Sequence, residues 1–450
     1  MTSKLTKWIK PLPTTPNLIK NEQAVSKKYK YWRIRMFLSM YVGYLMYYFV
    51  RKNIPYVGSF FIDDLHLTKL EFGIIGSSMA ITYAIGKFIS GLAVDKCNIR
   101  FFLAFGLIAS SVINLFFAYL PTLPLLAFFW GLNGVFQSMG FTTCAKGLVH
   151  WFSQNERGTI WTLHSSSKMA GITGIGFLST FFIATGHWKA VFYVPGILGL
   201  IIGVALLFVM TDKPECVGLP KIEDFRNDRT LVKVEEKSNL SHWQILSKYI
   251  FKNYYLWLVS IAAMALYFVR FTSLDWSTIF MKERGISPAA AASLLIAMPI
   301  VGIFGGISAG YLADKAFKGR CVPISIIYLV FLVASLWAMY AFISVTTHWW
   351  VIAFILAAVG FFVEGPQSVA MGALIGRLSP KESIGAAIGF VGIFEYIGTF
   401  FAGVIAAMII TEYSWKGLFT GCCLSVILTI MLLTLIWKKD SLISKEESKK

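Results

Sequence analysis

The sequence predicts an all-α membrane protein with twelve transmembrane helices in two pseudo-symmetric six-helix bundles. Three observations support this fold class. The 450 residues are 56% hydrophobic and only 14% charged, which is too apolar for a soluble globular protein. Twelve apolar runs reach the roughly 20 residues that a helix needs to cross a bilayer. In addition, motifs from the first half of the chain recur in the second half.

The apolar runs fall into two groups of six, separated by one long polar segment. The first group covers residues 34–56, 70–94, 101–120, 123–149, 159–185 and 188–210. The second group covers 254–281, 288–313, 322–344, 348–376, 383–410 and 414–437. The chain is therefore expected to comprise an N-terminal tail (1–33), a first bundle (34–210), a linker (211–253), a second bundle (254–437) and a C-terminal tail (438–450).

The positive charges lie mainly on one side of the predicted membrane. A formal net charge of +18 is compatible with nucleic acid binding, but Lys and Arg concentrate in the two tails, the linker and the loops of the same side. The opposite side carries only Lys69, Lys189, Lys282, Arg284 and Lys416. Because basic loops stay in the cytoplasm, both tails and the linker are predicted to be cytoplasmic, and no nucleic acid partner is expected.

Two fixed offsets relate the halves of the chain. Arg51 and Arg270 are 219 residues apart (270 − 51), and GLAVDK at 91–96 recurs with the same offset as GYLADK at 310–315. Further along, the offset is 227, as between Gly171 and Gly398 (398 − 171). Six spans per half give both halves the same orientation. A duplication of this kind predicts a substrate site near the midplane, between two bundles that rock.

The duplicated loops each carry an acidic and a basic residue at a tight cytoplasmic turn. These residues are Asp95 and Lys96 in the first half, and Asp314 and Lys315 in the second. We interpret them as gating loops that hold neighbouring helix ends in one state. The alternative is an ordinary turn whose charges only set the topology.

Arg51 and Arg270 place a guanidinium in each of two apolar segments. A central arginine costs roughly 2.5 to 3.5 kcal/mol on an insertion scale, so two of them at matching positions point to a function. The planar fork of arginine suits a phosphate dianion. Tyr44, Tyr48 and Arg51 are spaced like one face of a helix, so the first of these cations ends an aromatic stripe. The alternative is that each arginine pairs with a carboxylate or snorkels to the membrane interface.

The chain resembles the organophosphate:phosphate antiporters of the major facilitator superfamily almost end to end. The resemblance is carried by YYFVRKN at 47–53, YAIGKFISGLAVDK at 83–96, VHWFSQNERG at 149–158, VGLP at 217–220, YFVRFTSLDW at 267–276 and AAIGFVGIFEYIG at 386–398. The resemblance implies that Arg51 and Arg270 bind phosphate and that Lys87 is a basic residue of the second span. It also implies that the central cavity is lined by Tyr44, Tyr48, Tyr83, Tyr267 and Tyr396.

Four positions depart from the glycerol-phosphate members of that family. Lys168 stands where they have histidine, Pro299 where they have glutamate, Glu364 where they have tyrosine, and Glu395 where they have a small residue. Lys168 and Glu395 are equivalent by the 227 offset (395 − 168), and opposite charges in a membrane interior are expected to be paired or hydrated.

These charged positions allow two interpretations. Glu395 and Glu364 can accept hydrogen bonds from sugar hydroxyls while Lys168 supports the anion, which favours a hexose over glycerol. Alternatively, they form structural ion pairs. His164, one turn before Lys168, is either a proton carrier or a neutral core histidine.

The function predicted from these residues is exchange of a sugar phosphate, a hexose phosphate such as glucose-6-phosphate, for inorganic phosphate. A glycerol-3-phosphate antiporter is the first alternative. A transporter-like sensor of hexose phosphate, with a membrane kinase as partner, is the second. No enzyme chemistry, metal or cofactor is expected. We expect a monomer in the lipid bilayer of a bacterial cytoplasmic (inner) membrane.

Overall fold

The computed structural model describes residues 10–15, 19, 21–94, 96–226, 246–379 and 383–447. Within these ranges all regular structure is helical, which confirms the predicted all-α fold class. Nine helical stretches in the described ranges are long and apolar enough to cross a membrane, judged by length and composition. One of them, Ala386–Ser444, contains the last two predicted spans. The nine do not include α2 (Glu22–Phe49) and α6 (Leu123–Trp151), on which the first and fourth predicted spans lie. Tyrosines in α2 and buried amide side chains in α6 lower the mean hydropathy of these two helices.

Seven helices cover the first six predicted spans. They are α2 (Glu22–Phe49), α3 (Ile54–Asp64), α4 (Lys69–Val94), α5 (Ile99–Phe117), α6 (Leu123–Trp151), α7 (Gln154–Ala184) and α8 (Ala190–Val209). The first predicted span is thus two helices, α2 and α3, with Arg51 in the break. A 3₁₀ turn, η1 (Pro214–Val217), and the short helix α9 (Ile222–Arg226) follow α8.

The remaining helices cover the last six predicted spans. They are η3 (Leu246–Phe251), α11 (Tyr254–Asp275), α12 (Ser277–Glu283), α13 (Pro288–Leu295), α14 (Ala297–Lys315), α15 (Cys321–Phe342), α16 (Trp349–Ser368), the π-helical turn η4 (Val369–Ala373), α17 (Leu374–Leu378) and α18 (Ile384–Glu447). Pro299 lies in the first turn of α14, where a missing N–H is tolerated, and α13 ends just before it.

The contacts divide the chain into two compact units. Unit 1 comprises Met1–Asn53, Thr82–Ile175 and Lys189–Lys237. Unit 2 comprises Ile54–Ile81, Gly176–Trp188 and Ser238–Lys450. Unit 2 therefore contains α3, the first half of α4 and the end of α7 beside the second half of the chain. The bundle and linker boundaries expected from the sequence stay a prediction, and residues 227–245 of that linker lie outside the described ranges.

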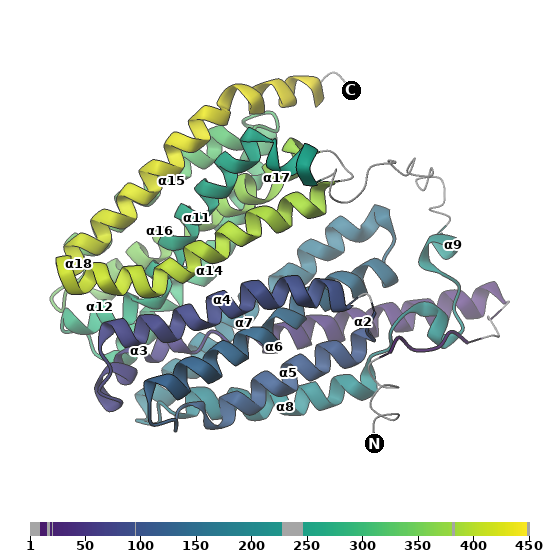
Figure 1. Ribbon diagram of the computed structural model, residues 1–450, viewed down its shortest axis with the longest axis horizontal. Coiled ribbons are helices and arrows are strands. Elements are labelled where there is room, and N and C mark those ends of the chain that lie inside the picture. Colours follow the sequence, from purple (N-terminus) through teal and green to yellow (C-terminus); the bar gives the residue numbers. More distant parts are fainter. Residues whose placement is uncertain are drawn as a thin grey trace. The chain divides into compact units, whose positions relative to one another are not determined.

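Long helices pack along their lengths within each unit. In unit 1, α5 packs against α8 and α6, and Figure 1 shows α5 and α8 side by side. In unit 2, α11 packs against α18, and α14 packs against α16. Figure 1 also shows α18 as two arms that meet in a bend. The bend is at Ser414, whose φ of 58° interrupts the helix between the eleventh and twelfth predicted spans.

The sequence repeat corresponds to repeated contacts in the two units. A Cβ atom on Gly171 would lie 2.7 Å from the carbonyl oxygen of Leu45, and one on Gly398 would lie still closer to that of Met264. Met264 follows Leu45 by 219 residues (264 − 45), and Gly398 follows Gly171 by 227. Both offsets therefore meet in one contact, which requires glycine because the helix backbones touch.

A second pair of repeated contacts links tryptophans to carboxylates in unit 2. Trp188 Nε1 donates to Asp64 Oδ2 at 2.6 Å, and Trp415 Nε1 donates to Glu283 Oε2 at 2.6 Å. Asp64 and Glu283 are again 219 residues apart (283 − 64). A buried indole N–H needs an acceptor, so both copies have kept one.

Gly398→Ala tests the close approach of α18 to α11. The added methyl group has no room beside the Met264 carbonyl, so we expect the substitution to destabilise the protein by about 1–3 kcal/mol. Gly389→Ala is the matched control, because a Cβ atom on Gly389 of the same helix meets nothing within 4 Å. Thermal denaturation of the purified proteins in detergent measures the effect. Equal melting temperatures for the two variants would contradict the packing argument.

Candidate functional site

Arg51 follows the end of α2 in unit 1, where the helix leaves a backbone carbonyl to be satisfied. Two buried asparagine side chains supply the donors. Asn114 Nδ2 donates to the Val50 carbonyl at 2.9 Å, and Asn133 Nδ2 donates to it at 3.1 Å. Asn53 in turn donates to Asn114 Oδ1 at 2.8 Å. These three amides, from α5, α6 and the break between α2 and α3, fix the backbone on either side of Arg51. Reasoning from the sequence missed this cluster.

The guanidinium of Arg51 lies over two tyrosine rings. Its central carbon is 4.2 Å from the centroid of the Tyr48 ring and 5.1 Å from that of the Tyr83 ring. Both tyrosines are buried. Cation–π contacts of this kind stabilise a partly dehydrated guanidinium. The structure thus brings Arg51, Tyr48 and Tyr83 together, as expected.

The aromatic stripe of α2 continues from Tyr48 to Tyr44. The two rings are 5.4 Å apart, and Tyr44 stacks on His164 of α7 at 5.3 Å. His164 is 4% exposed and makes a hydrogen bond with the backbone of Met40. These contacts favour the core histidine over the proton carrier.

The two predicted lysines of unit 1 lie one turn beyond these residues. Lys87 follows Tyr83 on α4, and its Nζ is 5.0 Å from the centroid of the Phe141 ring. Lys168 follows His164 on α7 and is half-buried. In unit 1, Lys87 and Lys168 therefore lie one helical turn after Tyr83 and His164, and Arg51 follows Tyr48 just beyond the end of α2.

Arg270 in unit 2 forms an ion pair with Glu364. The bond runs from Nη2 of Arg270 on α11 to Oε1 of Glu364 on α16, and the side chains are only 13% and 10% exposed. The guanidinium also lies 6.0 Å from the Tyr267 ring and 5.8 Å from the Phe271 ring. Glu364 therefore neutralises Arg270 in this structure, which is the pairing that the sequence left as an alternative.

A hydrogen-bonded chain lies beside this ion pair. Gln367 Nε2 donates to the hydroxyl of Tyr267 at 2.7 Å, and Tyr267 makes a side-chain hydrogen bond with Glu395 of α18. Tyr396, the next residue, is half-buried. The sequence did not indicate Gln367, although its position one turn after Glu364 places it on the same helical face.

The gating role of the duplicated loops stays a prediction. Asp95 lies outside the described residues, and Lys96, Asp314 and Lys315 are exposed. The described contacts near these turns involve other residues. In unit 1, Lys146 Nζ donates to the Val94 carbonyl, and Asp212 Oδ1 accepts from the N–H of Ile99 at 3.2 Å.

The corresponding turn in unit 2 is held in a similar way. Arg377 donates to the Gly319 carbonyl and forms a 3.2 Å ion pair with Asp440. Asp440 Oδ2 accepts from the N–H of Val322 at 3.0 Å. In both units a carboxylate that follows the last span of the half thus caps the start of a long helix.

Unit 2 also contains two ion pairs that join α3 and α4 to α12. Lys282 pairs with Asp63, and Lys69 Nζ lies 2.7 Å from Glu283 Oε1. Each pair links a residue of the first half of the chain to one of the second half. Because these side chains are partly exposed, each ion pair contributes little stability and can open at a small free-energy cost.

Each unit thus presents one arginine on an aromatic surface, with a carboxylate or lysines nearby. Such an arrangement binds an anion with two oxygens in a plane, as in a phosphate group. Tyrosine, glutamine and glutamate side chains around Arg270 can exchange hydrogen bonds with hydroxyl groups. These groups are chemically suited to a phosphorylated, hydroxyl-bearing molecule.

The comparisons with known proteins agree with this chemistry. The sequence profile of the Major Facilitator Superfamily matches residues 40–368 and 319–450. A probable hexose phosphate transport protein of Chlamydia pneumoniae is 37% identical over 95% of this chain and 96% of its own length. A membrane sensor protein of Salmonella typhimurium is 32% identical (94% and 95%). A hexose-6-phosphate:phosphate antiporter of the same organism is 31% identical (90% and 90%).

A solved structure supports the fold. The crystal structure of a bacterial homolog of the human lysosomal transporter Spinster superposes with a TM-score of 0.69 at 16% identity, covering 92% of this chain and 97% of that one. The apolar helices and the relatives identify a multi-pass protein of a bacterial inner membrane. The chain belongs to the Major Facilitator Superfamily and, within it, to the organophosphate:phosphate antiporters, which are transporters rather than enzymes.

Proposed function

We propose that this chain exchanges a hexose phosphate, such as glucose-6-phosphate, for inorganic phosphate by alternating access, with both termini in the cytoplasm. The observation that carries the proposal is the duplicated arginine. Arg51 and Arg270 occupy equivalent positions in the repeat, and each lies on aromatic rings in its own unit. Relatives of this chain are described as transporting hexose phosphate and as exchanging it for phosphate.

Exchange follows from the cost of dehydrating uncompensated charge. An empty carrier would have to close around two guanidiniums, and like charges repel strongly where water is excluded. Glu364 offsets the charge of Arg270. A phosphate dianion offsets the remaining positive charge, so a loaded carrier closes more readily than an empty one. Inorganic phosphate and a sugar phosphate share the group that satisfies this condition.

Glu364 makes the binding of cargo a competition at Arg270. A phosphate group that engages this guanidinium must displace or share the Glu364 carboxylate. The displaced carboxylate is then an acceptor beside Gln367 and Tyr267, where a sugar hydroxyl can donate to it. Together with Glu395, these groups give a hexose more partners than they give glycerol, which is our reason for preferring the hexose.

The second candidate is a sensor of hexose phosphate that binds without transport and signals to a membrane kinase. A relative described as a membrane sensor matches almost the whole chain, and a sensor needs the same phosphate-binding residues. The hexose phosphate transport protein is the more similar of the two, at 37% against 32% identity. We therefore retain the transporter as the proposal, and a monomer as the transporting species.

Exchange in liposomes tests this function directly. Purified protein in phosphate-loaded liposomes is expected to take up labelled glucose-6-phosphate, and only when phosphate is present inside. Arg51→Lys and Arg270→Lys should each reduce the exchange rate about tenfold or more, since one lost charge-assisted hydrogen bond is worth roughly 1.5–3 kcal/mol. Arg284→Lys, at the end of α12, is the control that keeps the rate.

The other outcomes assign the function differently. Binding of glucose-6-phosphate without uptake would identify a sensor. Uptake that is independent of internal phosphate would exclude obligatory exchange, and normal rates in both arginine variants would exclude the arginine site.

Glu364→Gln tests the competition at Arg270. Removing one partner of a buried ion pair costs roughly 3–5 kcal/mol because it leaves an uncompensated charge, so the melting temperature without ligand should fall. Inorganic phosphate should then raise the melting temperature of the variant more than that of the parent protein. Glu412→Gln, at an exposed position of α18, is the control. An unchanged phosphate response in Glu364→Gln would refute the competition.

Glu395→Gln tests the recognition of the sugar. An amide accepts hydrogen bonds less strongly than a carboxylate, so inhibition of phosphate exchange by glucose-6-phosphate should weaken about tenfold. Inhibition by glycerol-3-phosphate should change much less. The ratio of the two inhibition constants measures the preference. If the ratio stays the same, Glu395 has a structural role and the hydroxyl hypothesis is wrong.

A further inference from the structure

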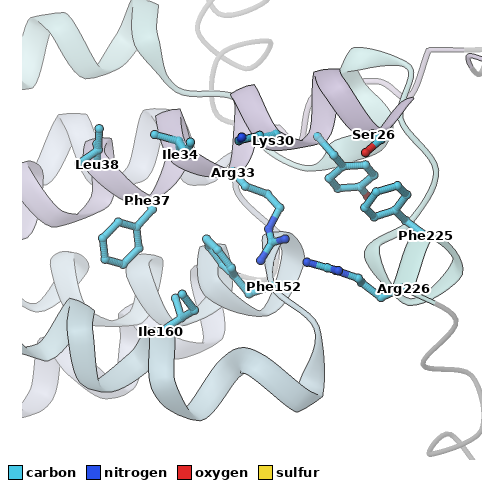
Figure 2. A pocket seen from close by; sticks show the side chains of 11 residues that line it. Ser26, Lys30, Arg33, Ile34, Phe37, Leu38, Phe152, Ile160, Phe225 and Arg226 are labelled. Carbon is cyan, nitrogen blue, oxygen red and sulfur yellow. The ribbon is translucent and has the colours of Figure 1, made fainter. Parts of the chain in front are cut away.

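A cavity of 480 Å³ lies in unit 1, far along α2 from Arg51. Figure 2 shows its lining side chains, which come from α2, from the turn before α7, from α7 itself and from α9. Three of them are cations: Lys30, Arg33 and Arg226. We call these three residues the basic cluster. The other end of the cavity is apolar, with Phe37 and Ile160.

One carboxylate balances only part of the basic cluster. Glu156 lies 2.5 Å from Arg33 Nη2 and 3.6 Å from Arg226 Nη2. Burial works to raise the pKa of Glu156, but the hydrogen bonds from Arg33 and the Ser153 N–H prevail and lower it. Glu156 is therefore ionised at neutral pH. The lining residues include three cations and no carboxylate, so the lining itself has an excess of positive charge, while Glu215, Glu223 and Asp224 are near enough to act on the lining Tyr29.

Arg33 has donor capacity left over within the described part of the chain. Its guanidinium stacks on Phe152 at 4.9 Å, and Nη2 donates to Glu156. Its buried Nε has no hydrogen-bond partner among the described residues. A buried N–H without an acceptor costs free energy, and an anion in the cavity would offer one.

The basic cluster shares one helical face with Arg51. Arg33, Phe37, Tyr41, Tyr44, Tyr48 and Arg51 follow one another at spacings of three or four residues, which places them along one stripe of α2. Phe37 and Tyr41 are 5.9 Å apart, and Tyr44 and Tyr48 are 5.4 Å apart. Cations thus mark both ends of an aromatic stripe, and Arg51 follows directly where α2 ends.

We infer that the basic cluster is a second anion site, which takes the phosphate group of the cargo on the cytoplasmic side before it reaches Arg51 or after it leaves. The inference rests on the proposed function and on the cytoplasmic position of the N-terminal tail. A volume of 480 Å³ is in the range of small-molecule pockets and is large enough for inorganic phosphate or a sugar phosphate. Its role is to concentrate anions at the mouth of the pathway, which acts on the rate of capture.

Sided transport kinetics test the second site. Inorganic phosphate exchange is measured in everted and in right-side-out membrane vesicles. Arg226→Gln and Arg33→Gln should raise KM for phosphate about tenfold at the cytoplasmic face, with kcat changed less than twofold and KM at the other face unchanged. Lys27→Gln, an exposed cation of the same helix outside the cavity lining, should behave like the parent protein. Equal KM values in all variants would overturn the inference.

Glu156→Gln separates an anion site from a structural ion pair. If Arg33 and Glu156 only join α2 to α7, then Arg33→Gln and Glu156→Gln break the same pair and should shift KM in the same direction. An anion site requires opposite directions, because loss of Glu156 leaves the basic cluster more positive and should lower the cytoplasmic KM. Shifts in the same direction would refute the site.

Two further measurements identify the occupant. The double variant Arg51→Lys/Arg270→Lys should retain a weak phosphate-binding site in the purified protein in detergent, and adding Arg33→Gln and Arg226→Gln should abolish it. This binding measurement does not require exchange, so it decides the second site even if the proposed transport fails. The sided kinetics are repeated in proteoliposomes of phosphatidylcholine with and without phosphatidylglycerol. An effect of the variants only with phosphatidylglycerol would assign the basic cluster to a lipid headgroup and overturn its role in capture.

Discussion

The free energy of a guanidinium away from water governs the organisation of this protein. An arginine in a membrane interior needs a partner that lowers its charge or replaces its hydration. The two units meet this requirement differently. The guanidinium of Arg51 lies over the rings of Tyr48 and Tyr83. The side-chain amides of Asn114 and Asn133 donate hydrogen bonds to the carbonyl of the preceding residue, Val50. Arg270 has a carboxylate, Glu364, in direct contact.

The ion pair with Glu364 is the described contact that distinguishes Arg270 from Arg51. Both come from one ancestral position, because the repeat aligns them and the helix contacts around Gly171 and Gly398 are also repeated. The packing has therefore been kept while the polar groups have diverged. In the proposed exchange, cargo at Arg270 displaces or shares the Glu364 carboxylate, so binding on this side would depend on what else the cargo can donate.

The ends of the helices carry a different kind of electrostatics from the middle. The ion pairs Lys282–Asp63 and Lys69–Glu283 are partly exposed, as is the pair of Arg33 and Glu156. Partly hydrated pairs of this kind are cheap to break, which suits segments that must separate during a transport cycle. The buried Arg270–Glu364 pair is costly to break unless cargo replaces one partner. The partly exposed pairs can therefore open at a small free-energy cost, whereas opening the buried Arg270–Glu364 pair requires a replacement partner.

The sequence by itself determined the fold class, the approximate positions of the apolar spans and the duplication, and it singled out Arg51 and Arg270 as candidate site residues. These properties follow from hydropathy, from fixed offsets and from the cost of charge in apolar segments, all of which are local or pairwise in the chain. It also indicated Tyr44 and Tyr48, because residues three or four apart share a helical face, and the resemblance to the antiporter family added Tyr83. Gln367 and the asparagines around Val50 gave no such signal, since a polar residue in an apolar helix has many uses.

Only the tertiary structure decided which partners these residues have. The sequence left Glu364 as a hydroxyl acceptor or an ion-pair partner, and the structure pairs it with Arg270, 94 residues away. It left His164 as a proton carrier or a core residue, and its stacking on Tyr44 favours the core. Near the turns with Lys96 and Lys315, the structure shows contacts of Lys146, Asp212, Arg377 and Asp440. Long-range pairing depends on how helices are rotated and packed against one another, and periodicity along one helix contains no information on that rotation.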